Sequence, residues 1–126
     1  EAGGGKRPMH TIIPAMLRRG GKVVMPFGVM GGAYQPCGHA RLVSNLEDFG
    51  MDLQAAIDAP RCFSGAGGMQ VERGYDTEVR ADLARMGHAV SVPHDPIGGA
   101  QAIIIDDSGV LIGGSDPRKD GFALGY

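Results

Sequence analysis

The chain has 126 residues, of which 43% are hydrophobic and 21% charged, and its formal net charge is −2. This composition is typical of a folded globular domain rather than a disordered chain, and no apolar run is long enough to span a bilayer, so no membrane partner is expected. The 12 Lys and Arg residues are scattered among 14 acidic residues and Trp is absent, which argues against a nucleic acid partner.

The first half of the chain predicts a hairpin followed by a helix. Two apolar segments, residues 11–17 and 23–27, flank a glycine turn, which is typical of two paired strands. Residues 28–32 read Gly-Val-Met-Gly-Gly and predict the glycine-framed end of a strand. The apolar spacing within residues 42–49 then predicts a helix that ends at Gly50.

Two shorter helices are expected in the middle of the chain. Asp52 is a good N-cap for the first of them, which must stop before Pro60 because proline disfavours a helical conformation in the preceding residue. Residues 69–72 predict a short strand. Asp76 is the expected cap of the next helix, and Gly87 stands where a helix commonly ends.

The chain closes with a second predicted hairpin. Residues 101–105 and 110–112 flank Asp107-Ser108-Gly109, which is a strong turn signal. Three helices among six or seven short strands, with a hairpin at each end, predict an α+β layered fold. The 22 glycines are unusually many, so we expect many backbone positions with positive φ or close approach.

The Gly31-Gly32 turn permits three interpretations. A phosphate cradle has little support, because the G-x-G-x-x-G order and the Lys-Ser/Thr ending of a P-loop are missing. An oxyanion hole fits the residues, because consecutive glycines let successive N–H groups converge without obstruction by Cβ atoms. A tight packing turn fits equally well, and the segment alone does not decide between these two.

Other residue types give weaker signals. No serine lies in a G-x-S-x-G elbow, and the four histidines have no metal-ligand spacing, so no metal is expected. Cys37 is a possible nucleophile near a helix start, but a small buried apolar role is favoured, and we expect both cysteines to be reduced. His10 and Thr11, near the start of the first strand, are candidates for substrate contacts.

Taken together, the segments resemble the gamma-glutamyltransferase family of N-terminal-nucleophile hydrolases over nearly the whole chain, from Lys6 to Tyr126. The resemblance is carried by motifs in a fixed order. They are Lys-Arg-Pro-Met-His-Thr-Ile-Ile-Pro at 6–14, the turn ending at 31–32, Asp-Phe-Gly-Met-Asp-Leu-Gln-Ala-Ala at 48–56, Asp-Ala-Pro-Arg at 58–61, Met-Gly-His at 86–88, Gly-Gly-Ala-Gln-Ala-Ile at 98–103 and Asp-Pro-Arg-Lys-Asp-Gly at 116–121.

This resemblance implies a part of a four-layer αββα sandwich, here the C-terminal portion of a small subunit formed by residues 1–126. In the family a precursor cleaves itself and frees an N-terminal Thr that attacks a gamma-glutamyl or related small amide, and the acyl group passes to water or an amine. Gly31 and Gly32 match the turn whose N–H groups stabilise the oxyanion. The implied partners are the rest of the precursor, a small amide and further copies in an oligomer, with no cofactor.

Three departures from the family pattern shape the prediction. His10 and Thr11 stand where typical members carry two serines that bind the substrate α-carboxylate. The turn continues as Ala-Tyr-Gln-Pro-Cys-Gly-His, which looks more like the amidohydrolase branch that includes oxamate amidases. No Thr-Thr-His-type processing site is present, and Glu1 is not an initiator Met, so we expect the chain to be separated from a nucleophile-bearing segment. The alternative is a noncatalytic binding or structural module derived from this family.

Overall fold

The computed structural model describes residues 1–126 and contains two β-sheets. The larger sheet is antiparallel with the order β1-β2-β6-β7, and the smaller has the order β3-β4-β5, in which β4 and β5 are parallel. The strands are β1 (Pro14–Arg19), β2 (Lys22–Met30), β3 (Cys62–Gly65), β4 (Gly68–Val71), β5 (Val90–Ser91), β6 (Gly99–Ile105) and β7 (Leu111–Ser115).

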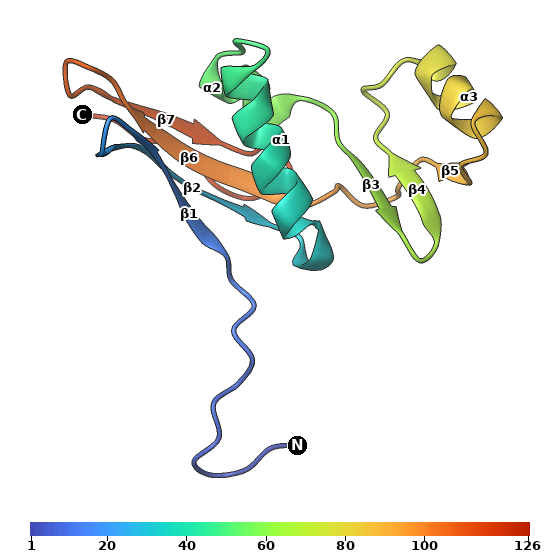
Figure 1. The fold of residues 1–126 in the computed structure, drawn as a ribbon, viewed down its shortest axis with the longest axis horizontal. Helices are drawn as coiled ribbons and strands as arrows, with labels where there is room; N and C mark the ends of the chain where they lie inside the picture. Colours follow the sequence, from blue (N-terminus) through green and yellow to red (C-terminus); the bar gives the residue numbers. More distant parts are fainter.

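The helices divide between the two sheets. They are the 3-10 turn η1 (Gly32–Tyr34) and the helices α1 (Gln35–Glu47), α2 (Leu53–Asp58) and α3 (Thr77–Arg85). Helices α1 and α2 lie on one face of the larger sheet, whereas α3 connects β4 to β5 beside the smaller sheet (Figure 1). None of these helices is both long and apolar enough to cross a membrane. The segment before β1 extends away from both sheets (Figure 1).

The hydrophobic core fills the space between the larger sheet and its two helices. Val29 pairs with Ala100 across β2 and β6, and alternation along the strands points both toward the helices. Ile57 of α2 is fully buried against this face, and burial of such a side chain contributes about 1.5–3 kcal/mol. Gly114 makes this packing possible, because a Cβ there would lie 2.7 Å from the Ile57 side chain.

Local signals in the sequence predict most of these elements correctly. The Asp52 carboxylate accepts a hydrogen bond from the Ala55 N–H at 2.9 Å, and α2 ends at Asp58, two residues before Pro60, as expected. Gly87 follows α3 with φ 95°. Ten of the 22 glycines have positive φ, which confirms the backbone role expected for many of them.

The start of the first strand differs from the expectation, and the cap of α3 is confirmed in position but not in its hydrogen bond. The first strand begins at Pro14 rather than at residue 11, because the Ile13 N–H donates to the Gln35 side chain at 3.3 Å instead of joining a neighbouring strand. Asp76 occupies the N-cap of α3, but its side chain makes no capping hydrogen bond. The apolar residues of α3 are not buried, and Met86 just beyond it is 75% exposed.

The face of the larger sheet opposite α1 and α2 carries no helix (Figure 1). Apolar side chains such as Met16, Ile103 and Leu111 are exposed there, and together with the C-terminal residues 122–126 they line a shallow groove. The larger sheet with α1 and α2 therefore forms one sheet layer and one helical layer of a layered fold.

Candidate active site

The Gly31-Gly32 turn lies at the carboxyl end of β2, where the chain leaves the sheet and enters η1. Gly31 has φ 135° and Gly32 has φ 57°, values that side chains disfavour. The Gly31 carbonyl accepts a hydrogen bond from the Tyr34 N–H at 3.1 Å, which closes the turn. The Gly31 N–H donates to no group of the chain, and the Gly32 N–H opens η1, where it has no acceptor within the helix.

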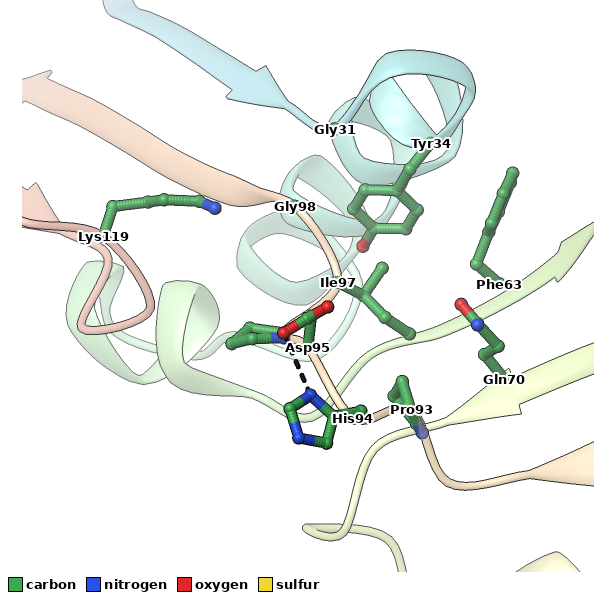
Figure 2. A pocket seen from close by; sticks show the side chains of 11 residues that line it. Gly31, Tyr34, Phe63, Gln70, Pro93, His94, Asp95, Ile97, Gly98 and Lys119 are labelled. Carbon is green, nitrogen blue, oxygen red and sulfur yellow. Dashed lines mark hydrogen bonds and ion pairs between the residues drawn. The ribbon is translucent and has the colours of Figure 1, made fainter.

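A cavity of about 500 Å³ adjoins this turn and is built from segments far apart in the sequence (Figure 2). Gly31 forms one wall, whereas Gly32 does not line the cavity. Gly98 lies directly against Gly31, since a Cβ on Gly31 would be 3.0 Å from the Gly98 Cα. The remaining lining residues are Tyr34, Phe63, Gln70, Pro93, His94, Asp95, Pro96, Ile97 and Lys119.

His10 and Thr11 are exposed, and neither lines this cavity. The structure nevertheless joins Thr11 to the glycine turn through Gln35, whose side chain is buried. The Gln35 Nε2 donates to the Thr11 carbonyl at 2.8 Å and to the Gly32 carbonyl at 3.2 Å. Gln35 is not among the residues predicted from the sequence, and it fixes the backbone around Thr11 relative to the turn.

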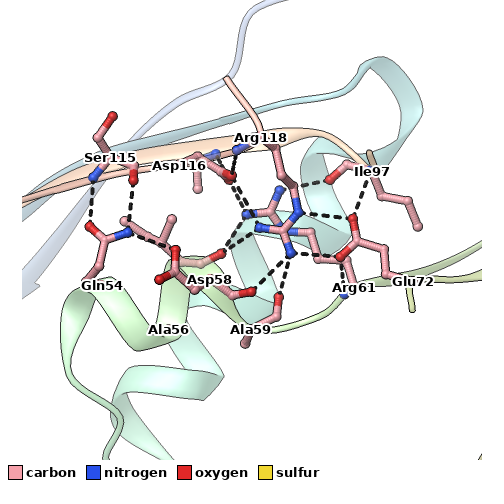
Figure 3. A network of polar contacts seen from close by, with 12 residues as sticks. Gln54, Ala56, Asp58, Ala59, Arg61, Glu72, Ile97, Ser115, Asp116 and Arg118 are labelled. Atoms are coloured by element: carbon pink, nitrogen blue, oxygen red, sulfur yellow. Dashed lines mark hydrogen bonds and ion pairs between the residues drawn. The ribbon is translucent and has the colours of Figure 1, made fainter. Parts of the chain in front are cut away.

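A buried ionic network lies behind the cavity and involves two of the motifs noted in the sequence (Figure 3). The Arg61 guanidinium contacts the Asp116 carboxylate at 2.5 Å, and their side chains are 5% and 0% exposed. Arg118 donates to the Glu72 carboxylate at 2.7 Å. The Arg61 Nη1 also donates to the Ile97 carbonyl at 2.8 Å, and the Ile97 N–H donates to Glu72 at 3.0 Å.

The network therefore fixes the segment at Ile97 that leads to Gly98 and the cavity wall. It also joins the Asp-Ala-Pro-Arg and Asp-Pro-Arg motifs, since Arg118 donates to the carbonyls of Asp58 and Ala59 at 3.1 and 3.2 Å. These contacts tie α2 to β7 and to the smaller sheet.

The environment keeps both carboxylates of the network ionised. Burial raises the pKa of Asp116, but hydrogen bonds from the N–H groups of Arg118 and Ala100 and from Arg61 outweigh it, so the pKa lies below its ordinary value. Burial also raises the pKa of Glu72. Hydrogen bonds from the Arg118 side chain and from the N–H groups of Ile97 and Arg61 outweigh burial, so this pKa too lies below its ordinary value. Burial lowers the pKa of Arg118, but the carboxylates of Glu72 and Asp116 outweigh burial and raise it above its ordinary value.

The other candidates from the sequence are not brought together into a site. Cys37 is exposed rather than buried, so the expected packing role is wrong, and Cys37 and Cys62 are both free thiols. No group of three or more His, Cys, Asp and Glu side chains is arranged to hold a metal ion.

Comparison with known proteins decides the family. The family model for gamma-glutamyltranspeptidase matches residues 1–126. The chain belongs to the gamma-glutamyltranspeptidase family. The glutathione hydrolase-like proenzyme of Bacillus subtilis is 39% identical over 129 residues, which cover 95% of this chain and 25% of that protein. The oxamate amidohydrolase proenzyme of Klebsiella pneumoniae is 36% identical over 131 residues, which cover 97% of this chain and 25% of that protein.

Solved structures of the family share the fold. A cephalosporin acylase from Bacillus halodurans superposes with a TM-score of 0.84 at 41% identity, covering 99% of this chain and 25% of that chain. The gamma-glutamyltranspeptidase from Pseudomonas nitroreducens complexed with L-DON gives a TM-score of 0.85 at 24% identity, covering 99% of this chain and 67% of that chain. The α+β fold of the N-terminal-nucleophile hydrolases is thereby confirmed. The chain spans about a quarter of the length of the curated relatives.

Proposed function

We propose that the full-length natural protein containing this chain is an autoprocessed enzyme that cleaves gamma-glutamyl or related small amides and transfers the acyl group to water or an amine. The observation that supports this most is the Gly31-Gly32 turn. It is exposed, the Gly31 N–H is unpaired, and Gly31 lines a cavity. The relatives support the same class, since they are named as glutathione hydrolase, acylase and amidohydrolase proenzymes.

In the proposed mechanism, the nucleophile is an N-terminal Thr freed by self-cleavage in a segment that precedes residues 1–126 in the precursor. Its hydroxyl attacks the amide carbon while its α-amine takes the hydroxyl proton. The N–H groups of Gly31 and Gly32 stabilise the negative oxygen that develops, and the leaving amine departs with the proton. Water or an acceptor amine then attacks the acyl-enzyme, and the threonine hydroxyl is restored.

The proposed role of His10 and Thr11 is contact with the acyl portion of the substrate. Gln35 holds the Thr11 backbone and the Gly32 backbone through one amide nitrogen, so this segment and the turn keep a fixed relation. An imidazole and a hydroxyl are hydrogen-bonding groups suited to a carboxylate or carbonyl. Because two serines are absent here, a small amide such as oxamate is a candidate substrate beside gamma-glutamyl compounds, as the Klebsiella pneumoniae relative suggests.

The chain offers a matched pair of glycines for testing the proposed oxyanion turn. Gly32 and Gly20 both have φ 57°, and a Cβ added at either meets no atom within 4 Å. Replacement by Ala should therefore cost about 1–2 kcal/mol of backbone strain at each site. Only at Gly32 would the strain also displace an N–H group that the proposal assigns to the oxyanion.

The experiment compares amide turnover by Gly32→Ala, Gly32→Val and Gly20→Ala in the full-length protein, after mass spectrometry has confirmed processing. Loss of one oxyanion donor lowers kcat by about 100- to 1000-fold, and partial displacement of the Gly32 N–H is expected to give about 10- to 100-fold. Gly20→Ala should retain turnover with a similar loss of stability. Equal turnover by all three variants would refute the assignment, whereas a folded wild-type protein that cleaves no amide would favour a noncatalytic module.

A further inference from the structure

One cation in the cavity beside the glycine turn has no partner. The aliphatic stem of Lys119 lies flat on Gly99, where an added Cβ would be 2.5 Å from the lysine Cγ and 2.8 Å from its Cε. The absence of a side chain at Gly99 therefore creates the channel in which Lys119 lies. Lys119 lines the cavity together with Gly31 and Gly98, and Figure 2 shows its amine directed toward Gly98.

The neighbouring charges leave Lys119 free to bind a ligand. Its ammonium group makes no ion pair within 4.0 Å, whereas the buried guanidinium groups of Arg61 and Arg118 are paired with carboxylates. The one carboxylate on the cavity wall belongs to Asp95, which is paired with His94 at 3.2 Å. The Asp95 side chain is 92% exposed, so water screens its charge.

Lys119 and the glycine turn pack against two consecutive residues, Gly99 and Gly98. Gly98 lies directly against Gly31 in the cavity wall, and the stem of Lys119 packs on the next residue, Gly99. A ligand whose oxygen lies at the Gly31 N–H therefore occupies the cavity that Lys119 also lines. Half-buried Lys119 is also less screened than a lysine on an open surface.

We propose that Lys119 is a specificity-determining residue that binds a carboxylate on the acyl portion of the substrate while the scissile carbonyl lies at Gly31-Gly32. This inference rests on the proposed function and narrows its substrate class to short monoamides of dicarboxylic acids. His10 and Thr11 lie outside the cavity lining, so Lys119 supplies a charge that those residues do not place there.

The test uses the full-length natural protein and two pairs of substrates that differ in charge but little in shape, namely oxamate with oxamide and succinamate with succinamide. Lys119→Met keeps the stem and removes the charge, Lys119→Arg keeps the charge, and Lys22→Met is the control at an exposed lysine in the β1-β2 hairpin. Because a hydrogen-bonded charge pair is removed, Lys119→Met should lower kcat/KM for the anionic amides about 10- to 100-fold. The neutral amides should change less than about twofold, and Lys119→Arg should retain most of the activity. An equal loss for charged and neutral amides, or no loss for either, would overturn the proposal.

A binding measurement separates this inference from the proposed function. Calorimetric titration with oxalate and succinate requires no turnover, and Lys119→Met should weaken their binding by the same factor. Binding that depends on Lys119 in a protein that cleaves no amide would support the carboxylate site and contradict the enzymatic proposal. Amide turnover without binding that depends on Lys119 would support the enzymatic proposal and contradict the carboxylate site. Absence of both turnover and binding would reject the site.

Discussion

Replacement of Asp116 by Asn tests the buried network most sharply. The wild-type carboxylate accepts four hydrogen bonds, from the Arg61 guanidinium at 2.5 Å, the Ala100 N–H at 2.7 Å, and the Arg118 N–H and Nη1 at 2.9 and 3.2 Å. Asn has the same shape, but it removes the charge and turns an NH₂ group toward donors. Arg61, whose side chain is 5% exposed, is left without its counter-ion.

Breaking a buried pair by removing one partner destabilises a protein by about 3–5 kcal/mol. We therefore expect Asp116→Asn in the full-length protein to lose about this much free energy of unfolding in urea. The matched control is Asp107→Asn in the exposed β6-β7 turn, which should stay within about 0.5 kcal/mol of wild type. A loss below about 1 kcal/mol for Asp116→Asn would refute the stabilising role assigned to the network.

The same network predicts how stability depends on pH. The folded-state pKa values of Asp116 and Glu72 are lowered relative to their ordinary values of about 3.9 and 4.3. Their contribution is therefore fully present above about pH 5 and is lost as the pH falls through the lowered folded-state values. Urea unfolding between pH 7 and pH 3 should show this loss, with a shallower slope in Asp116→Asn; identical slopes would contradict the lowered pKa of Asp116.

Three further substitutions test the site walls. Gly109→Ala should destabilise the protein by about 1–2 kcal/mol through left-handed backbone strain. Gly98→Ala should cost more, because its Cβ would also lie 2.5 Å from a backbone oxygen, whereas a Cβ at Gly109 meets no atom. Equal melting temperatures would contradict this close approach. Tyr34→Phe should be neutral or stabilising by about 1 kcal/mol, since the buried hydroxyl has no partner, and a clear loss on thermal unfolding would show otherwise. Gln35→Leu should raise KM for amides and lower kcat, because it frees both the segment at Thr11 and the Gly32 carbonyl of the turn, and unchanged KM and kcat would argue against both links.

The sequence predicts local elements well where a single residue determines an end. Asp52 and Pro60 define α2, and the turn at residues 107–109 predicts the last hairpin, although it is the Asp106 carboxylate that accepts the hydrogen bonds from Ser108 and Val110. An aspartate in such a turn commonly accepts from the backbone two residues on, and here Asp106 rather than Asp107 does so.

The features that the sequence does not predict depend on contacts between distant segments. Strand β5 has only two residues and is formed by pairing with β4, so it has no periodicity of its own. Arg61 and Asp116 are 55 positions apart, and their motifs were visible, but their pairing was not. The Ile13 N–H donates to the Gln35 side chain instead of pairing with a strand, and no local sequence pattern predicts this contact.

Covalent amide cleavage by a processed precursor that contains this chain can be tested directly. The most direct measurement is the intact mass of the full-length natural protein before and shortly after mixing with a gamma-glutamyl anilide or oxamate. We expect two chains, with the smaller containing residues 1–126 and gaining the mass of the acyl group at its N-terminal Thr. A single unprocessed chain that cleaves amides, or turnover without any acylated small chain under rapid quenching, would contradict it.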